Sequence, residues 1–179
     1  MGIKVFAPYA DGTAKSCSFE SGTPFAPSFK VKAFALTDNE GKFVHTNGNG
    51  TECPCYGFLI EHEELGRMLY ITDCELIKFK FKNIDYILLG VNYSEDSIED
   101  LDAKTRHVIT GHLSLQTAVE FVKSTSERSN LKGVIMCHLS DFNAEPEHFI
   151  NEMQKAVNST VLVAKKGMSI ELRADGCPF

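Results

Sequence analysis

The sequence predicts a mixed α/β domain in which strands and helices pack in layers. Segments of strand character alternate with amphipathic helical segments, and glycine, asparagine and proline separate them. Continuous apolar runs at residues 84–91 and 133–137 are typical of strands that are buried on both faces. The chain has 179 residues, of which 43% are hydrophobic and 23% charged, a balance typical of a globular protein. We therefore expect residues 1–179 to form a single layered α/β domain.

The first part of the chain is predicted to supply strands and loops. Residues 3–7 and 29–36 have strand character, and the stretch between them is rich in loop-forming residues. Residues 37–54 contain three glycines and three asparagines, which indicates a long loop of the kind that often carries function. Residues 56–61 and 68–72 flank a polar turn and are expected to form a β-hairpin.

Two helices and four further strands are expected in the rest of the chain. Ser114 can cap a helix whose apolar residues fall on one face, and Pro146 suits the first turn of a helix over residues 143–157. The predicted strands are short apolar runs at residues 84–91, 133–137, 160–164 and 169–172.

Charge and composition exclude several classes of protein. The net charge of −6 opposes non-specific binding to the phosphate backbone of nucleic acids. No apolar run approaches the roughly 18 residues of a membrane span, and the first residues do not resemble a secretory signal. We therefore expect a cytoplasmic protein whose six cysteines are reduced thiols. Cys53 and Cys55 lack the second cysteine pair that a zinc ribbon requires.

Two residues that can bind metals directly follow predicted strands. Asp73 follows the strand over 68–72, and His138 follows the strand over 133–137. Ligand sites of α/β proteins gather at the carboxyl ends of strands, and carboxylates and imidazoles bind zinc, iron and manganese. The residues alone leave open a structural alternative, in which Asp73 caps a turn and His138 is a hydrogen-bonded core histidine.

An ordered set of short motifs resembles the metallo-β-lactamase fold superfamily. The resemblance extends over residues 3–172, and the most similar subgroup is the phage and Firmicutes-type proteins of the ribonuclease Z and phosphodiesterase branch. The motifs are, in order, Tyr56-Gly57-Phe58-Leu59-Ile60-Glu61-His62, Leu69-Tyr70-Ile71-Thr72-Asp73, Val91-Asn92-Tyr93, Gly111-His112-Leu113-Ser114 and Cys137-His138-Leu139-Ser140-Asp141-Phe142-Asn143.

The resemblance implies a role for four residues. Asp73 corresponds to the carboxylate that bridges two metals, and His138 corresponds to the last metal-binding histidine. The ligand histidine that precedes the Tyr-Gly-Phe strand corresponds to His45. His112 corresponds to a catalytic histidine that does not bind metal and acts as a proton donor or supports the ligands.

The sequence also departs from the pattern of this superfamily. It lacks the H-x-H-x-D-H cluster, and Gly90-Val91 stands where an acidic partner is common. The resemblance therefore implies an N-terminally incomplete sandwich that lacks four of the usual seven ligands of a two-metal site. His45, Asp73 and His138 would hold one ion at most, zinc or else manganese or iron, with weak binding and little activity from this chain alone.

The resemblance favours a metal-dependent hydrolase that acts on a phosphodiester or nucleotide-like ester. Two alternatives stay open, namely a catalytically inactive remnant that acts by binding, and one subunit of a split metallo-hydrolase. Without the first strands, one sheet face and one sheet edge would be uncovered. We therefore expect a homo-oligomer, or a partner chain, that covers this surface.

Overall fold

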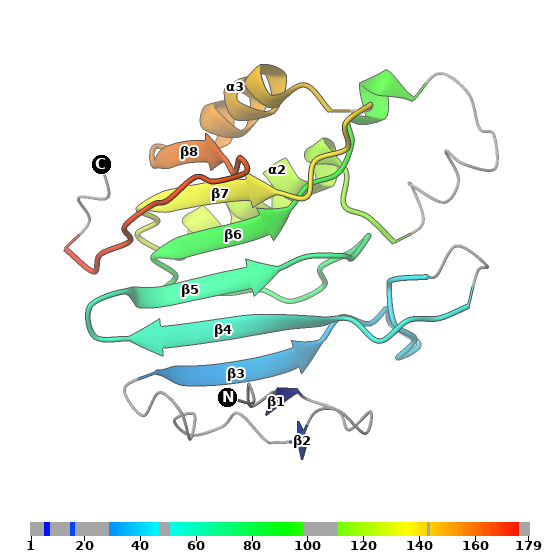
Figure 1. The fold of residues 1–179 in the computed structure, drawn as a ribbon, viewed down its shortest axis with the longest axis horizontal. Helices are drawn as coiled ribbons and strands as arrows, with labels where there is room; N and C mark the ends of the chain where they lie inside the picture. The colour runs from blue at the N-terminus through cyan, green and yellow to red at the C-terminus, as the bar shows by residue number, and fades with distance from the viewer. Residues whose placement is uncertain are drawn as a thin grey trace.

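The computed structural model describes residues 6–7, 15–16, 29–46, 51–98, 111–142 and 144–175, and its main feature is a six-stranded sheet (Figure 1). The elements, in chain order, are β1 (Phe6–Ala7), β2 (Lys15–Ser16), β3 (Lys30–Ala35), β4 (Tyr56–His62), β5 (Gly66–Ile71), β6 (Tyr86–Gly90), the 3₁₀ helix η1 (Glu95–Ser97), α2 (Leu115–Ser126), β7 (Gly133–Cys137), α3 (Pro146–Ala156) and β8 (Thr160–Val163). The layered α/β class predicted from the sequence is confirmed.

The strands of the sheet follow one another in chain order, from β3 at one edge to β8 at the other. β3, β4 and β5 are antiparallel, because the turn between β4 and β5 is short enough for a hairpin. From β5 to β8 the strands are parallel, and α2 and α3 provide the last two crossover connections. The carboxyl ends of the parallel strands therefore lie together, at the right of Figure 1.

Helix α2 begins where the sequence predicts, whereas α3 begins at Pro146, three residues later than predicted, because a residue before proline disfavours helical backbone. The side chain of Ser114 accepts a hydrogen bond of 3.1 Å from the Thr117 backbone N–H, which satisfies one of the free donors of the first turn of α2. Pro146 occupies the first turn of α3, where its missing N–H costs no hydrogen bond. Neither of these α-helices, in the part of the chain that the structure describes, has the length and apolarity that a bilayer span requires.

The core lies between the sheet and the two helices. Alternate strand residues such as Leu69, Ile87 and Val134 are fully buried there against helix residues such as Val122 and Phe149. Their exclusion from water is the main source of stability, at about 1.5–3 kcal/mol for each large apolar side chain.

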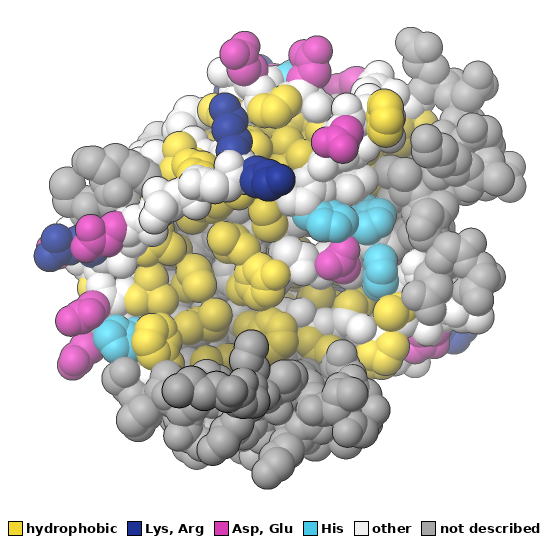
Figure 2. Space-filling model, viewed as in Figure 1, with side chains coloured by type: hydrophobic (Ala, Val, Ile, Leu, Met, Phe, Trp, Pro, Cys, Tyr) yellow, Lys and Arg dark blue, Asp and Glu magenta, His cyan; other side chains and the backbone are white. Residues whose placement is uncertain are grey.

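The opposite face of the sheet is also apolar. Phe58, Tyr70 and Leu88 lie side by side in the register of β4 to β6, half-buried and outside the helix-facing core. Figure 2 shows hydrophobic side chains gathered over this face, on the side away from the helices. Among the described residues, no helix or second sheet covers it. We call this surface the open face.

Two strand predictions need correction. Residues 169–172 form no strand, because this segment does not pair with the edge strand β8. The segment instead crosses the sheet near the amino ends of its strands, where the Tyr86 hydroxyl donates a 2.8 Å hydrogen bond to the Arg173 carbonyl. In the N-terminal stretch expected to be loop, β2 pairs in parallel with β1. Residues 3–5 of the first predicted strand lie outside the described residues.

Candidate metal centre

Asp73 lies two residues after the end of β5 and has a left-handed backbone conformation, with φ of 53°. This conformation is uncommon for residues other than glycine and turns the chain sharply at the end of the strand. The next residue, Cys74, is buried in the core and anchors the turn. The carboxylate of Asp73 stays 40% exposed, at the edge of the sheet.

His138 directly follows β7 and also has a left-handed backbone conformation, with φ of 60°. Asn92, at the end of β6, donates a 2.9 Å hydrogen bond from Nδ2 to the His138 carbonyl. The backbone N–H of Ser140 donates to the Asn92 carbonyl at 2.9 Å. Asn92 therefore supports the turn that carries His138.

Asp73, His112 and His138 converge at this edge. Asp73 Oδ1 lies 3.3 Å from His138 Nε2 and 3.8 Å from His112 Nδ1. One ligand atom from each of the three residues can be chosen so that all lie within 4.8 Å of one another. Figure 2 shows histidine side chains beside an acidic one on this part of the surface. Two imidazole nitrogens and a carboxylate oxygen form a donor set that zinc, manganese and iron accept.

His112 reaches the cluster from the junction before α2. The Asn92 backbone N–H donates to the Leu113 carbonyl at 3.0 Å, and Tyr93 forms a parallel bridge with Ser114. These contacts extend β6 alongside the junction and fix its position. The His112 and His138 rings are stacked, with centroids 5.1 Å apart.

His45 lies next to His112, and their ring centroids are 5.4 Å apart. The predicted loop over residues 37–54 is folded back on itself where it is described, by bridges between Thr37 and Phe43 and between Thr46 and Glu52. His45 Nδ1 donates a 2.9 Å hydrogen bond to the Gly111 carbonyl, since a carbonyl oxygen can only accept. The described contacts place His45 beside the group of Asp73, His112 and His138, not within its 4.8 Å limit.

The structure brings Asp73 and His138 together at one edge of the sheet. The sequence separated His112 from the ligands, whereas the structure brings its Nδ1 into the group of potential ligand atoms. The metal-binding roles of His45, Asp73 and His138 and the proton-donor role of His112 stay predictions.

Two supporting residues were missed in the sequence. Asn92 follows a buried strand in the same way as Asp73 and His138, and this position was a usable signal. The Glu75 carboxylate accepts a 3.2 Å hydrogen bond from the Gly111 backbone N–H. No local pattern marks Glu75, because its partner lies 36 residues away.

Two cysteines are next to candidate ligands in the sequence, buried Cys74 after Asp73 and half-buried Cys137 before His138. The pKa of the Cys137 thiol is raised to about 11, mainly because the thiol is partly removed from solvent and secondly because of the negative charge of Asp73. Burial also raises the pKa of the Cys74 thiol well above its usual range. Both thiols are therefore protonated at neutral pH, and the polar donors at the surface of the site are oxygen and nitrogen atoms.

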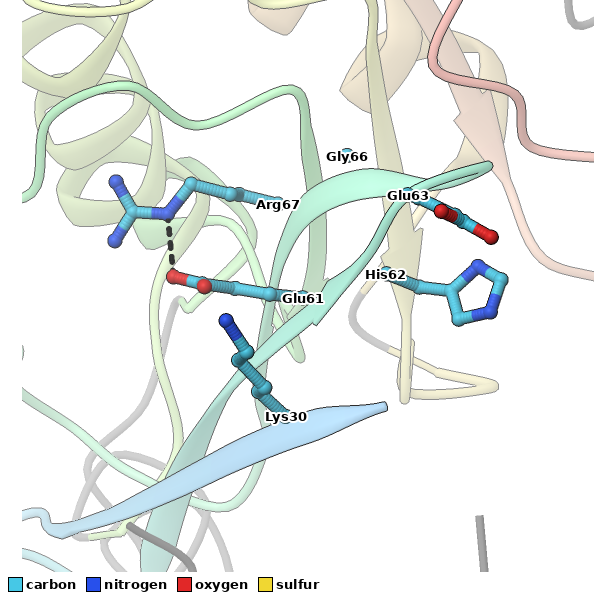
Figure 3. Close-up of a pocket in the computed structure, with 6 residues that line it drawn as sticks. All are labelled: Lys30, Glu61, His62, Glu63, Gly66 and Arg67. Atoms are coloured by element: carbon cyan, nitrogen blue, oxygen red, sulfur yellow. Dashed lines mark ion pairs between the residues drawn. The ribbon is translucent and has the colours of Figure 1, made fainter. Parts of the chain in front are cut away.

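A separate cavity of about 530 Å³ lies at the turn between β4 and β5, close to the start of β3. Figure 3 shows Lys30 from β3 directed toward Glu61, which forms a 2.8 Å ion pair with Arg67. None of the potential ligand residues lines this cavity, so it is not part of the candidate metal centre.

Comparisons with known proteins support the fold. No protein-family model and no curated protein matches the sequence. The structure is similar to the crystal structure of the metallo-β-lactamase fold protein YhfI from Bacillus subtilis, with a TM-score of 0.56 and 18% identity, over 80% of this chain and 48% of YhfI. It is also similar to Igni18, described as a novel metallo hydrolase from the archaeon Ignicoccus hospitalis, with a TM-score of 0.52 and 14% identity, over 94% of this chain and 58% of Igni18.

These similarities define the class of fold: the chain has a metallo-β-lactamase-like layered α/β fold. The chain spans about half the length of the two solved structures that it matches. At identities of 18% and 14%, the likeness concerns the fold alone, and function has to be argued from the site.

Proposed function

We propose that this chain is a metal-dependent hydrolase-type protein whose centre lies at the carboxyl ends of β5 and β7. The observation that carries the proposal is the meeting of Asp73, His112 and His138 within 4.8 Å. Residues as distant in the sequence as Asp73 and His138 meet here on turns with left-handed backbone, which cost roughly 1–3 kcal/mol each. Such strain is concentrated at functional sites, which favours a binding role over a purely structural one.

Asp73 and His138 are the ligands that the geometry supports best, and His45 is proposed as the further nitrogen ligand. The hydrogen bond from His45 Nδ1 to the Gly111 carbonyl holds the proton on Nδ1 and leaves Nε2 with a free electron pair. The ion is proposed to be zinc, or else manganese or iron, with one ion at most from this chain. Such an ion acts as a Lewis acid and lowers the pKa of its water to roughly 7.

In this proposal, Asn92, Asp73 and His112 have different roles in the site. Asn92 holds the turn of His138, and Asp73 contributes negative charge between the two neighbouring imidazoles. His112, with a side chain 15% exposed, donates a proton or a hydrogen bond to the oxyanion of the substrate. The proposed substrate class is a small phosphodiester or nucleotide-like ester, since the net charge of −6 disfavours a long polyanion.

Metal analysis of the purified chain tests the proposal. Wild-type protein should retain a divalent metal after dialysis, and His138→Ala should lose it while the far-ultraviolet circular dichroism spectrum is unchanged. Half-buried His148, on α3, offers a control, because His148→Ala removes an imidazole from outside the donor group. Equal metal content in wild type and His138→Ala would contradict the proposed centre.

The role of His112 needs its own variant. If His112 is a proton donor, His112→Ala should keep the metal content and melting temperature, while hydrolysis of a model phosphodiester falls about 10²–10⁴-fold. The distance of 3.8 Å between His112 Nδ1 and Asp73 Oδ1 is also short enough for the alternative, in which His112 is itself a ligand. In that case, metal content falls together with activity.

The alternative function is a binding protein without catalysis, either as a remnant or as one subunit of a split hydrolase. The open face favours it, because apolar surfaces of this kind form contacts between chains. We therefore keep the expectation of a homo-oligomer or a partner chain on the open face. Light scattering on dilute protein should give a mass above that of one chain, and Tyr70→Lys should lower it.

A further inference from the structure

The Gly111 peptide connects the candidate metal centre to a residue outside it. Gly111 is buried, and both of its polar backbone atoms bond to side chains. Its N–H donates to Glu75 Oε2 at 3.2 Å, and its carbonyl accepts from His45 Nδ1 at 2.9 Å. A buried backbone group without a partner is costly, so these two side chains determine where the peptide lies.

Gly111 is closely enclosed on the side of His45. Its φ of 109° is a conformation that side chains disfavour, and a Cβ atom there would lie 2.7 Å from His45 Nδ1. His45 therefore contacts the backbone of residue 111 directly. A small displacement of this peptide changes the hydrogen bond that orients the imidazole.

Glu75 is itself held in place by the loop that carries His45. The Glu75 backbone N–H donates to the Val44 carbonyl at 3.2 Å, one residue before His45. Glu75 therefore connects three segments of the chain, namely the turn after Asp73, the loop of His45 through its backbone N–H and the junction of His112 through its carboxylate.

We propose that Glu75 is a positioning residue of the metal centre, which acts through the Gly111 peptide on His45 and His112. This inference rests on the proposed function. In the proposed arrangement, Glu75 contacts neither the metal nor the substrate. The Glu75 carboxylate fixes the Gly111 N–H, the Gly111 carbonyl then fixes the proton and orientation of the His45 ring, and the following residue places His112. Hydrogen-bond partners of this kind typically contribute 10–100-fold to metal affinity.

Zinc affinity of the full chain, measured by competition with a fluorescent chelator, tests the inference. Glu75→Ala should weaken zinc binding about 10-fold, the lower end of the usual range, because Glu75 is exposed to solvent. Glu75→Gln should bind nearly as well as wild type, since an amide oxygen still accepts from Gly111. Glu75→Asp keeps the charge but shortens the side chain, and should lose affinity as Glu75→Ala does.

A matched control lies in the same loop region. Glu52 Oε1 accepts a 3.0 Å hydrogen bond from the Phe43 backbone N–H, which is the same kind of contact without a link to Gly111. Glu52→Ala should therefore leave zinc affinity unchanged. If Glu75→Ala and Glu75→Asp fold and bind zinc as tightly as wild type, or if Glu52→Ala weakens binding equally, the inference is wrong.

A readout that does not need metal separates this inference from the proposed function. In protein treated with a chelator, nuclear magnetic resonance should show slow hydrogen exchange of the Gly111 amide and a proton on His45 Nδ1. Both signatures should be lost in Glu75→Ala and kept in Glu75→Gln. Wild type that binds no zinc but shows these signatures would contradict the proposed function alone. Unchanged signatures in Glu75→Ala would overturn the role of Glu75.

Discussion

The two ends of the sheet carry charged side chains in different arrangements. At the amino ends of β6 and β7, Lys132 Nζ lies 2.6 Å from Asp85 Oδ1, and Asp85 Oδ2 accepts a 2.9 Å hydrogen bond from the Arg67 backbone N–H. At the carboxyl ends of β5 and β7, Asp73 Oδ1 instead faces two imidazoles at 3.3 and 3.8 Å. Both oxygens of Asp85 are therefore paired with donors of the chain, while the Asp73 carboxylate is 40% exposed.

This difference indicates at which end of the sheet the charged side chains stabilise the fold. The pair at the amino end is mostly shielded from solvent, and Lys132 also contacts the Ala174 carbonyl, which ties the C-terminal segment to the sheet. The carboxyl end has left-handed backbone at Asp73 and His138, and so stores strain. We infer that the charged side chains at the amino end stabilise the fold and that the left-handed turns at the carboxyl end reduce its stability.

The largest expected effect is at the amino end. Asp85→Ala removes the partner of Lys132 and leaves the Arg67 N–H without its acceptor, which should lower the free energy of unfolding by about 2–3 kcal/mol. Urea denaturation of chelator-treated protein measures the free energy of unfolding of the wild type and the variant. Glu40→Ala, which breaks an ion pair between exposed side chains, should have no measurable effect. Equal losses for Asp85→Ala and Asp73→Ala would remove the distinction between the two ends.

A smaller effect of opposite sign is expected at the carboxyl end. His138→Gly places glycine at a φ of 60°, a region that glycine occupies without steric cost. Protein without metal should become more stable by roughly 1 kcal/mol or less. Asn83, with φ of 55° outside the site, offers a comparison through Asn83→Gly. A loss of stability in His138→Gly would mean that its side chain contributes to the fold.

The smallest expected effect concerns alkaline pH. Burial raises the pKa of the Cys55 thiol from about 9 to about 11, so the unfolded chain loses this proton at a lower pH than the folded protein does. Cys55 therefore contributes stability that is fully present below pH 9 and is lost as pH rises to about 11. At pH 9.5 the loss should be below about 1 kcal/mol, and Cys55→Ala should remove this part of the pH dependence. Urea denaturation at pH 8 and 9.5 gives the comparison.

Much of the fold could be predicted because its signals are local. The alternation of apolar residues at the start of β3, the apolar run of β4, the Ser114 cap and the position of Pro146 all depend on neighbours within a few residues. The strand predicted over residues 169–172 failed because a strand also needs a partner. The two residues that follow this segment, Arg173 and Ala174, bond instead to the Tyr86 hydroxyl and the Glu64 carbonyl, near the amino ends of the strands.

The sequence by itself determined the layered α/β class, the start of α2 and the placement of Asp73 and His138 at strand ends. Only the tertiary structure decided that His112 joins these two residues and that Glu75 reaches Gly111. The physical reason is the range of the interactions. Strand and helix patterns come from contacts between near neighbours, whereas this site is built from turns that meet only after parallel strands and their crossover helices have packed.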